Sequence, residues 1–369
     1  MPTRPAGRAP VAALSLALAA AALAGAGCNL AGPAALRDGR QDYNAALQQT
    51  ANEQLLLNLV RLRYRDAPLF LEVTNITATY QLDAGAGASA TIPEQRLSAN
   101  QVLSPNLRAG WLERPTISYV PLQGDKFVSQ MLAPISLEHL LLLYHSGWSA
   151  ERIFRVCVQR LGPLANAPSA SGPTPQEAPE FAGFLAATRL LRKLQLRRAI
   201  DLGLVEADGR RHLALLIDAP EGDPDADALC AALGAPAGAR RLQLVQQIAR
   251  GAGERVGVET RSLLGCMFYL SHGVDVPEEH AALGLVTRTA AAGGGAFDWG
   301  EVLDGLFRVT VEPPEHGAAV AVRYRGTTFH VADTDLTTKS TFSFLSQLFA
   351  LQAGATPSGG PLLTLSIGG

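Results

Sequence analysis

The chain has few cysteines and little net charge, and each shortage excludes a class of protein. Four cysteines in 369 residues are too few for a disulfide framework. The net charge of −2 provides no overall field that would attract nucleic acid, so no nucleic-acid partner is expected. Hydrophobic residues make up 47% of the chain, and 36 glycines and 23 prolines supply many turns. This composition is typical of a globular protein.

The sequence also lacks the common motifs of catalysis. It contains no Gly-x-Ser-x-Gly elbow, no P-loop, no His-Glu-x-x-His and no Gly-x-Gly-x-x-Gly. The seven histidines are scattered, and none has the spacing of a metal site. We therefore expect no metal and no cofactor, and the balance is against an enzyme.

The prediction of the protein's location depends on one segment, Arg4–Cys28. Arg4 and Arg8 form a basic start, the nearly all-apolar run Val11–Ala24 follows, and Gly25–Gly27 adds small residues before Cys28. This order is typical of a secretory signal peptide, and the run is shorter than the about 18–20 residues of a membrane-spanning helix. The small residues followed by Cys28 resemble the bacterial lipobox, in which that cysteine is acylated and becomes the first residue.

The match to the lipobox departs at one position and leaves an alternative. Gly25 stands where lipoproteins usually carry leucine, and Leu23 lies two places too early. Ordinary cleavage after Ala24 or Ala26, each of which completes an Ala-x-Ala pattern, would give a soluble periplasmic protein.

An acylated Cys28 predicts that the membrane itself is a partner. The residue after it is Asn29 rather than Asp, which favours transfer to the outer membrane, with the folded chain facing the periplasm. Two acyl chains such as palmitate give stable anchoring, whereas one chain would not.

Helices and antiparallel hairpins occur in separate blocks, which predicts an α+β fold with helices packed against antiparallel sheet and hairpins in two lobes. The predicted organisation is a signal peptide over residues 1–27, a lipid-anchored tether over 28–41, an N-terminal lobe over 42–161, a linker over 162–179, and a C-terminal α+β lobe over 180–369 with a hairpin at 319–331 and a helix at 340–351. The linker is predicted from its Pro, Ala and Ser content.

In the N-terminal lobe we expect a long helix over Asp42–Arg65, because its leucines recur at helical spacing. A strand follows over Leu69–Gln81, and its apolar residues change phase partway, which predicts a bulge. Asp83–Leu107 is rich in Gly, Ala and Ser and is interpreted as a long loop before a strand at Thr116–Val120.

Local signals then predict caps and helix ends. Asp125 is expected to cap a short helix, Ser136 to cap the next one, and Ser149 to start a third helix that continues to Leu161.

In the C-terminal lobe, Leu242–Ala249 and Arg255–Glu259 are expected to pair as strands joined through a glycine-rich turn. Thr260 is expected to cap a helix so apolar that it must lie at the centre of the core. Further strands are expected at Phe307–Val311 and at 361–367.

The sharpest local motif is the Asp-x-Asp-x-Thr of Asp333–Thr337, which resembles the nucleophile motif of haloacid-dehalogenase-type phosphatases. Those enzymes need several parallel-sheet units downstream, and too little chain remains here, so we reject the motif. We expect instead that Asp333 and Asp335 form turns and a helix cap, with Lys339 paired to one of them.

If Cys28 is acylated, three cysteines remain. Cys157 and Cys266 both lie in apolar, helix-like surroundings, so we interpret them as small buried hydrophobes. A Cys157–Cys266 disulfide is the alternative in an oxidising compartment.

Several segments resemble an uncharacterised family of bacterial, mainly proteobacterial, envelope proteins described only as lipoproteins. The segments are Glu53–Tyr64, Arg114–Gly124 with Pro134 and Ile135, Thr260–Gly265, and Tyr324–Gly326 through Lys339–Phe342. The resemblance implies an envelope location and transfers no catalytic residue.

The sequence therefore predicts a lipid-anchored cell-envelope protein that binds or scaffolds other envelope proteins without catalysis. The rival hypothesis is an envelope hydrolase whose site is assembled from distant segments. Its polar cluster would draw on Arg61, Tyr64, Arg261, Asp333, Asp335 and Lys339.

Overall fold

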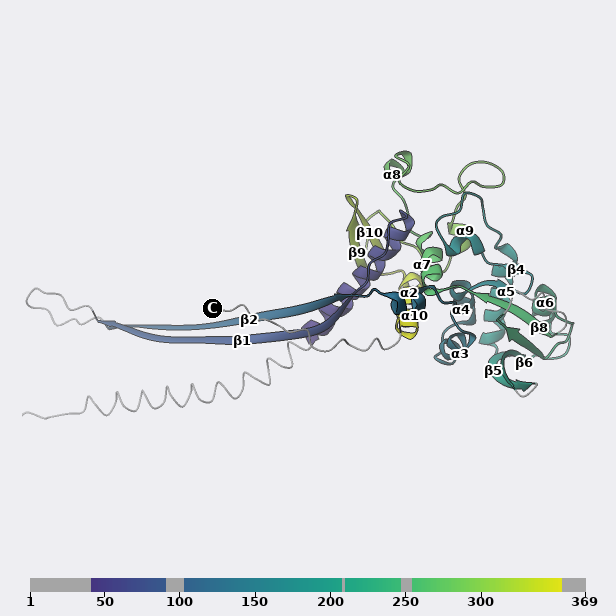
Figure 1. The fold of residues 1–369 in the computed structure, drawn as a ribbon, viewed down its shortest axis with the longest axis horizontal. Helices are drawn as coiled ribbons and strands as arrows, with labels where there is room; N and C mark the ends of the chain where they lie inside the picture. The colour runs from purple at the N-terminus through teal and green to yellow at the C-terminus, as the bar shows by residue number, and fades with distance from the viewer. Residues whose placement is uncertain (1–40, 91–102, 208–209, 247–253, 354–369) are drawn as a thin grey trace, which may run out of the picture.

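The computed structural model describes residues 41–90, 103–207, 210–246 and 254–353. The predicted signal peptide, Cys28 and the predicted strand at 361–367 lie outside the described residues. Figure 1 shows a body of helices and sheets from which one long hairpin projects. The predicted α+β fold is confirmed. Within the described ranges, no helix combines the length and apolar character needed to cross a membrane.

The first described element is a helix over residues 41–63, close to the predicted range. Its leucines form one buried face, on which Leu56 and Leu59 are fully buried. The helix ends where Arg65 adopts a positive φ of 61°, and Pro68 follows soon after.

The projecting hairpin consists of β1 (Leu71–Ala90) and β2 (Leu103–Pro121), which pair antiparallel along their whole length. The predicted loop is therefore wrong for Asp83–Ala90 and Leu103–Leu107, which belong to these two strands, while its residues 91–102 lie outside the described residues. Small residues are typical of loops, but the antiparallel ladder is made by backbone groups, which Gly and Ala also supply. The predicted change of phase is confirmed, because the register shifts between Val73 and Asn75.

Three helices follow: α2 (Asp125–Leu132), α3 (Leu137–His145) and α4 (Ala150–Cys157). The side chains of Ser136 and Ser149 cap α3 and α4, as predicted. Asp125 does not cap α2, because Gly124 occupies that position and Asp125 lies in the first turn. The helix predicted to reach Leu161 ends at Cys157, where the chain turns into a strand.

A six-stranded sheet has the order β4-β3-β8-β7-β6-β5. Its strands are β3 (Val158–Leu161), β4 (Leu164–Ala165), β5 (Ile200–Ala207), β6 (Arg210–Ile217), β7 (Arg241–Val245) and β8 (Arg255–Thr260). The predicted pairing of β7 with β8 is confirmed, but the two strands run parallel and do not form a hairpin.

Helices α5 (Ala182–Leu196), α6 (Pro224–Ala232) and α7 (Leu263–Ser271) complete this part of the body (Figure 1). The prediction that the apolar helix is central is confirmed, since Leu263, Met267 and Leu270 of α7 are fully buried. Its cap is Ser262, which accepts a hydrogen bond from the backbone N–H of Gly265, and not the predicted Thr260.

The predicted linker, residues 162–179, contains β4 and the short 3-10 helix η1 (Pro168–Ser171). Its Asn166, Ala167 and Ala170 are fully buried against the core. The division of the chain into two lobes stays a prediction.

The remaining elements are α8 (Glu278–Ala282), α9 (Gly300–Leu303), the hairpin of β9 (Ala318–Tyr324) and β10 (Thr327–Ala332), and α10 (Leu336–Ala353). The hairpin and the final helix agree with the prediction. The predicted strand at Phe307–Val311 is wrong, because only isolated bridges form there, at Val309 and Thr310.

Candidate functional site

Arg261 is the centre of a buried hydrogen-bond network. Its side chain is almost fully enclosed, and its Nη1 donates to the carbonyls of Arg155, Val156 and Val158 at 3.1, 3.1 and 2.9 Å. Two of these carbonyls lie at the C-terminal end of α4, where the helix dipole favours a positive charge. Burial lowers the pKa of Arg261, and the guanidinium lies 3.9 Å from the ring centre of Tyr269.

The same network includes the segment before η1. Arg261 also donates to the carbonyl of Asn166 and to the hydroxyl of Ser171, at 3.0 Å in the second case. The side-chain amide of Asn166 in turn donates to the carbonyls of Arg155 and Val158. Because Arg261 uses its donors on backbone carbonyls and one hydroxyl, it holds together α4, β3 and η1 rather than facing a substrate.

A second cluster surrounds Tyr64 at the end of the first helix. The Tyr64 hydroxyl lies 2.7 Å from Nδ1 of His280, and its ring packs edge-on against Tyr324. Asp66 accepts hydrogen bonds from Tyr324 and from Arg325. Burial raises the pKa of Tyr64 to about 12, although Arg63 and Arg325 oppose this shift.

Asp333, Asp335 and Lys339 have the local roles that the sequence predicted. Lys339 pairs with Asp333 at 2.5 Å, and Asp335 accepts a hydrogen bond from the backbone N–H of Thr338 at the start of α10. The six residues proposed for a hydrolase thus lie in separate groups: Arg261 has its own network, Tyr64 contacts His280 and Tyr324, and Arg61 donates to Asn58.

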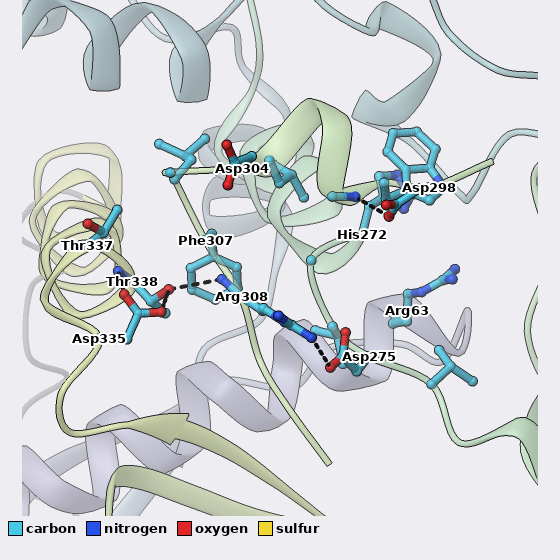
Figure 2. Close-up of a pocket in the computed structure, with 18 of the residues that line it drawn as sticks. Arg63, His272, Asp275, Asp298, Asp304, Phe307, Arg308, Asp335, Thr337 and Thr338 are labelled. Atoms are coloured by element: carbon cyan, nitrogen blue, oxygen red, sulfur yellow. Dashed lines mark hydrogen bonds and ion pairs between the residues drawn. The ribbon is translucent and has the colours of Figure 1, made fainter. Parts of the chain in front are cut away.

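A pocket of about 560 Å³ opens between the end of α7, the loop around α9 and the start of α10 (Figure 2). We call it the acidic pocket. The charged and titratable residues that line it are Arg63, His272, Asp275, Asp298, Asp304, Arg308 and Asp335.

Buried nitrogen groups line one side of the acidic pocket. His272 is 4% exposed, and neither ring nitrogen has a hydrogen-bond partner among the described residues. Its ring stacks on Trp299 at 4.0 Å, while burial and the charge of Arg63 lower the His272 pKa to about 3. Burial likewise lowers the pKa of Arg63 to about 10. His272 is therefore neutral at physiological pH, whereas Arg63 stays charged.

Most of the acids of this pocket are engaged by the chain itself. Asp335 binds Thr338, and the hydroxyl of Thr338 accepts from the backbone N–H of Arg308 (Figure 2). Asp298 accepts from the backbone N–H of Gly300 at 2.8 Å. Asp275 pairs with Arg308 at 3.4 Å, and burial raises the Asp275 pKa. These contacts stabilise the loop and do not form a nucleophile–base pair.

The root of the projecting hairpin is held by two amide side chains one helical turn apart. Asn58 accepts from the backbone N–H of Leu69 at 3.0 Å and donates to the carbonyl of Leu69 at 2.8 Å. Gln54 does the same for Leu71, at 2.7 and 3.1 Å. The helix thus binds the strand as a neighbouring strand would, and this fixes the direction in which the hairpin leaves the body.

Beside this root lies a groove of about 1130 Å³, which we call the root groove. Its walls are the helix over residues 41–63, the start of β1, β9 and α10. Exposed apolar side chains border it, including Leu71 at 39% and Tyr119 at 53% exposure. The groove is mainly apolar, but amide groups and the charged side chains of Glu53, Arg61, Glu72 and Arg323 also line it, as is usual for a binding site.

The described part of the chain contains no group of three or more His, Cys, Asp or Glu side chains placed to hold a metal ion. Cys157, Cys230 and Cys266 are free in this structure and buried, as expected for small hydrophobic side chains. Burial and the contact with the neighbouring Cys266 thiol raise the pKa of Cys157, and a Cys157–Cys266 disulfide in an oxidising compartment stays a prediction. No family model, curated protein or solved structure matches the chain.

The segments that carry the family resemblance come together in pairs. Ile135 donates its backbone N–H to the carbonyl of Arg261, and Tyr64 packs against Tyr324. The family itself stays a prediction. Sequence reasoning missed the acidic pocket and the root of the hairpin, because no local pattern brings Asn58 to Leu69 or His272 to Trp299.

Proposed function

We propose that this chain is a lipid-anchored cell-envelope protein, tethered to the outer membrane through Cys28 and facing the periplasm, with a binding rather than a catalytic role. The observation that carries the binding role is the β1/β2 hairpin, which leaves the body for 20 and 19 residues. Among the described strands, β1 and β2 pair only with each other, so beyond the contact of Leu71 with Gln54 each has one edge to which no described strand is paired. Open strand edges favour association with another chain.

The direction of the first helix supports the anchor. Asn58 binds Leu69, whereas Gln54, one turn nearer the N-terminus, binds Leu71, which lies farther out along the hairpin. The N-terminal end of the helix therefore points in the same direction as the hairpin (Figure 1). A lipid on Cys28 and the hairpin would face the same surface.

The anchor is tested by replacing Cys28 with Ser and fractionating the cells. We expect the native protein in the outer-membrane fraction and the variant in the soluble periplasmic fraction. Mass spectrometry should find acyl chains on the N-terminal cysteine of the native protein. An unmodified N-terminus, or a variant that still sediments with membranes until detergent is added, would contradict the anchor.

The binding role is tested separately by cross-linking in intact cells. The native chain is compared with a variant in which residues 75–118 are replaced by a short Gly-Ser linker and Cys28 is kept. We expect cross-linked species that depend on the hairpin. Identical cross-linking patterns would rule out the hairpin as the binding element.

A further inference from the structure

A buried histidine at the wall of the acidic pocket has no hydrogen-bond partner. His272 lines this pocket and is 4% exposed, and neither of its ring nitrogens is bonded within the described residues. Its pKa of about 3 keeps the ring neutral, so one ring nitrogen is a donor and the other is an acceptor. A buried polar group without a partner costs free energy, and its retention at the wall of a pocket points to a ligand that completes it.

Arg63 lies on the same side of the acidic pocket as His272 (Figure 2). It is 9% exposed, and its Nη1 donates to the hydroxyl of Thr174 at 3.1 Å and to the carbonyl of Thr287 at 3.5 Å. Its Nε has no hydrogen-bond partner, and within the described residues no carboxylate is paired with this guanidinium. A buried positive charge without a counter-charge is costly, so this side of the pocket favours a negatively charged group.

Two carboxylates of the same pocket lack a cationic partner. Within the described ranges, neither Asp298 nor Asp304 forms an ion pair, and Asp298 accepts a hydrogen bond from the backbone N–H of Gly300. The other two acids of the pocket are engaged by side chains of the chain itself. Figure 2 shows Asp304 across the pocket from Arg63. The side of Asp304 therefore favours a positively charged group.

A ligand of a single charge would be attracted by one side of this pocket and repelled by the other. A molecule that carries both a carboxylate and an ammonium group satisfies both sides. The volume of about 560 Å³ lies in the range of about 300–1,000 Å³ that is usual for small-molecule sites. Phe297, Trp299 and Phe307 also line the pocket and offer apolar surface to the rest of such a molecule.

The walls of the pocket are held in shape by the chain itself. The backbone N–H of Val309 donates to the carbonyl of Gly273 at 2.9 Å, and that of Asp275 donates to the carbonyl of Val309 at 2.9 Å. The two segments approach so closely that a Cβ atom on Gly273 would lie 2.6 Å from the carbonyl oxygen of Phe307. A site whose walls are fixed in advance pays less ordering cost when a ligand binds.

We propose that the acidic pocket binds a small zwitterion of the size of an amino acid or a dipeptide. Its carboxylate lies on the side of Arg63 and His272, and its ammonium group lies toward Asp304. This ligand site goes beyond the proposed envelope role and does not depend on it, because all the residues that form the site belong to the body. The body then has a binding function of its own beside that of the hairpin.

Isothermal titration calorimetry of the purified full-length protein in detergent tests the site with three matched sets of probes. The first set contains the free L-amino acids and glycyl dipeptides, which carry both charges. The second set contains their N-acetyl derivatives, which lack the ammonium group. The third set contains their C-terminal amides, which lack the carboxylate. Because the side chains are the same in all three sets, differences in affinity report the two charges.

We expect at least one free amino acid or dipeptide to bind with a Kd below about 1 mM, and both of its modified forms to bind at least about tenfold more weakly. An N-acetyl derivative that binds as tightly as its parent would overturn the proposal, since it would show a site for anions. An amide that binds as tightly would overturn it as well, since it would show a site for cations. Binding of no probe at concentrations up to about 10 mM would also overturn it.

A matched pair of variants tests the ammonium side. Asp304→Asn removes the carboxylate and should weaken binding of the free amino acid at least about tenfold, while the weak binding of the N-acetyl derivative stays unchanged. Glu301→Gln is the control, because Glu301 is an exposed acid of α9 that does not line the pocket. This control should bind like the native chain. Equal affinities of the two variants would contradict the proposal.

The carboxylate side is tested by His272→Phe, which keeps a ring stacked on Trp299 but removes both nitrogens. Binding of the free amino acid should weaken at least about tenfold, although the melting temperature of the variant at pH 7 is no lower than that of the native chain. Loss of binding by a stable variant assigns the effect to the nitrogens and not to misfolding. A stable variant that binds as tightly as the native chain would overturn the assignment of this side.

Discussion

The Arg261 network and the β1/β2 hairpin use their hydrogen-bonding groups in opposite ways. Around Arg261, the guanidinium finds acceptors on α4, β3 and the segment before η1, and all of them are internal to the chain. The hairpin satisfies one edge of each strand and leaves the other edge without a partner among the described strands. The comparison teaches that the Arg261 network bonds within the chain, whereas the hairpin leaves strand edges to which no described strand is paired, and the proposed binding role rests on these edges.

The largest loss of stability should come from replacing Arg261, the centre of the buried hydrogen-bond network. Arg261→Met leaves several buried carbonyls without a donor and should lower the free energy of unfolding by about 4 kcal/mol or more. Chemical denaturation of the Cys28→Ser protein without its signal peptide measures this. Arg160→Met is the matched control, because Arg160 pairs with Glu259 at 3.4 Å with half of its side chain exposed, and the loss should stay below about 1 kcal/mol. Similar losses in both variants would contradict the assigned role of Arg261.

Substitutions at the root of the hairpin, where the two regions join, should lower the free energy of unfolding by an intermediate amount. Asn58→Leu keeps the volume but leaves the backbone N–H and C=O of Leu69 without their partner, and the expected loss is about 2 to 3 kcal/mol. Gln54→Leu, in the more exposed pair, should cost about 1 kcal/mol. Hydrogen exchange at the amides of Leu69 and Leu71 reports the two contacts separately. Unchanged exchange at Leu69 in the Asn58 variant would show that the amide does not hold the strand.

The buried His272 makes the body sensitive to acid. Its pKa is about 3 in the folded chain against about 6.5 when unfolded, so between these values the unfolded chain binds more protons. The stability contributed by the neutral ring is thus complete above about pH 6.5 and is lost as the pH falls toward 3. His272→Phe keeps the stacking on Trp299 and should add about 2 kcal/mol at pH 5 relative to the native chain.

Denaturation at pH 7 and pH 5 measures this difference, with the exposed His316→Phe as the control. The His316 variant should follow the native pH dependence. A His272 variant that loses stability between pH 7 and pH 5 as steeply as the native chain would contradict the prediction.

The smallest effect on the body should come from removing the hairpin. Replacing residues 75–118 by a short linker keeps the root at Leu69 and Leu71, so the free energy of unfolding of the body should change by less than about 1 kcal/mol. Near-ultraviolet circular dichroism and thermal unfolding report the body. A loss of several kcal/mol would show that the two regions are not independent and would break the comparison.

Local chemistry explains which predictions succeeded. Ser136 and Ser149 cap their helices through contacts three residues away, and Asp333 pairs with Lys339 six residues away, so all the partners lie close together in the sequence. The position of α7 was predictable in the same way, because a helix that is apolar on nearly every side must be buried in the core. The bulge near Val73 was predictable because a change of phase in a strand pattern has one simple explanation.

Other features required partners that are distant in the sequence. The parallel pairing of β7 and β8 depends on the path between them, and the burial of Arg261 depends on Asn166, which lies 95 residues away. The outer hairpin is a different case, because the alternation from Asn75 to Ala90 is present in the sequence. The sequence did not predict this strand because glycine and alanine are typical of loops as well as of strands, and only the pairing with Leu103–Trp111 distinguishes the two.

By itself, the sequence determined the fold class, the serine caps of α3 and α4, the local pairing of Asp333 with Lys339, and the apolar helix at the centre, because these depend on neighbours within a few residues. The caps predicted at Asp125 and Thr260 were wrong by one and two positions. It also contains the leader and Cys28, from which the anchor is predicted. Only the tertiary structure decided that Arg261 serves the core, that Asn58 and Gln54 hold the hairpin, and that His272 is buried against Trp299 with no hydrogen-bond partner among the described residues. The physical reason is that burial and hydrogen-bond pairing are properties of groups that meet in space, and the order of residues alone does not specify which groups meet.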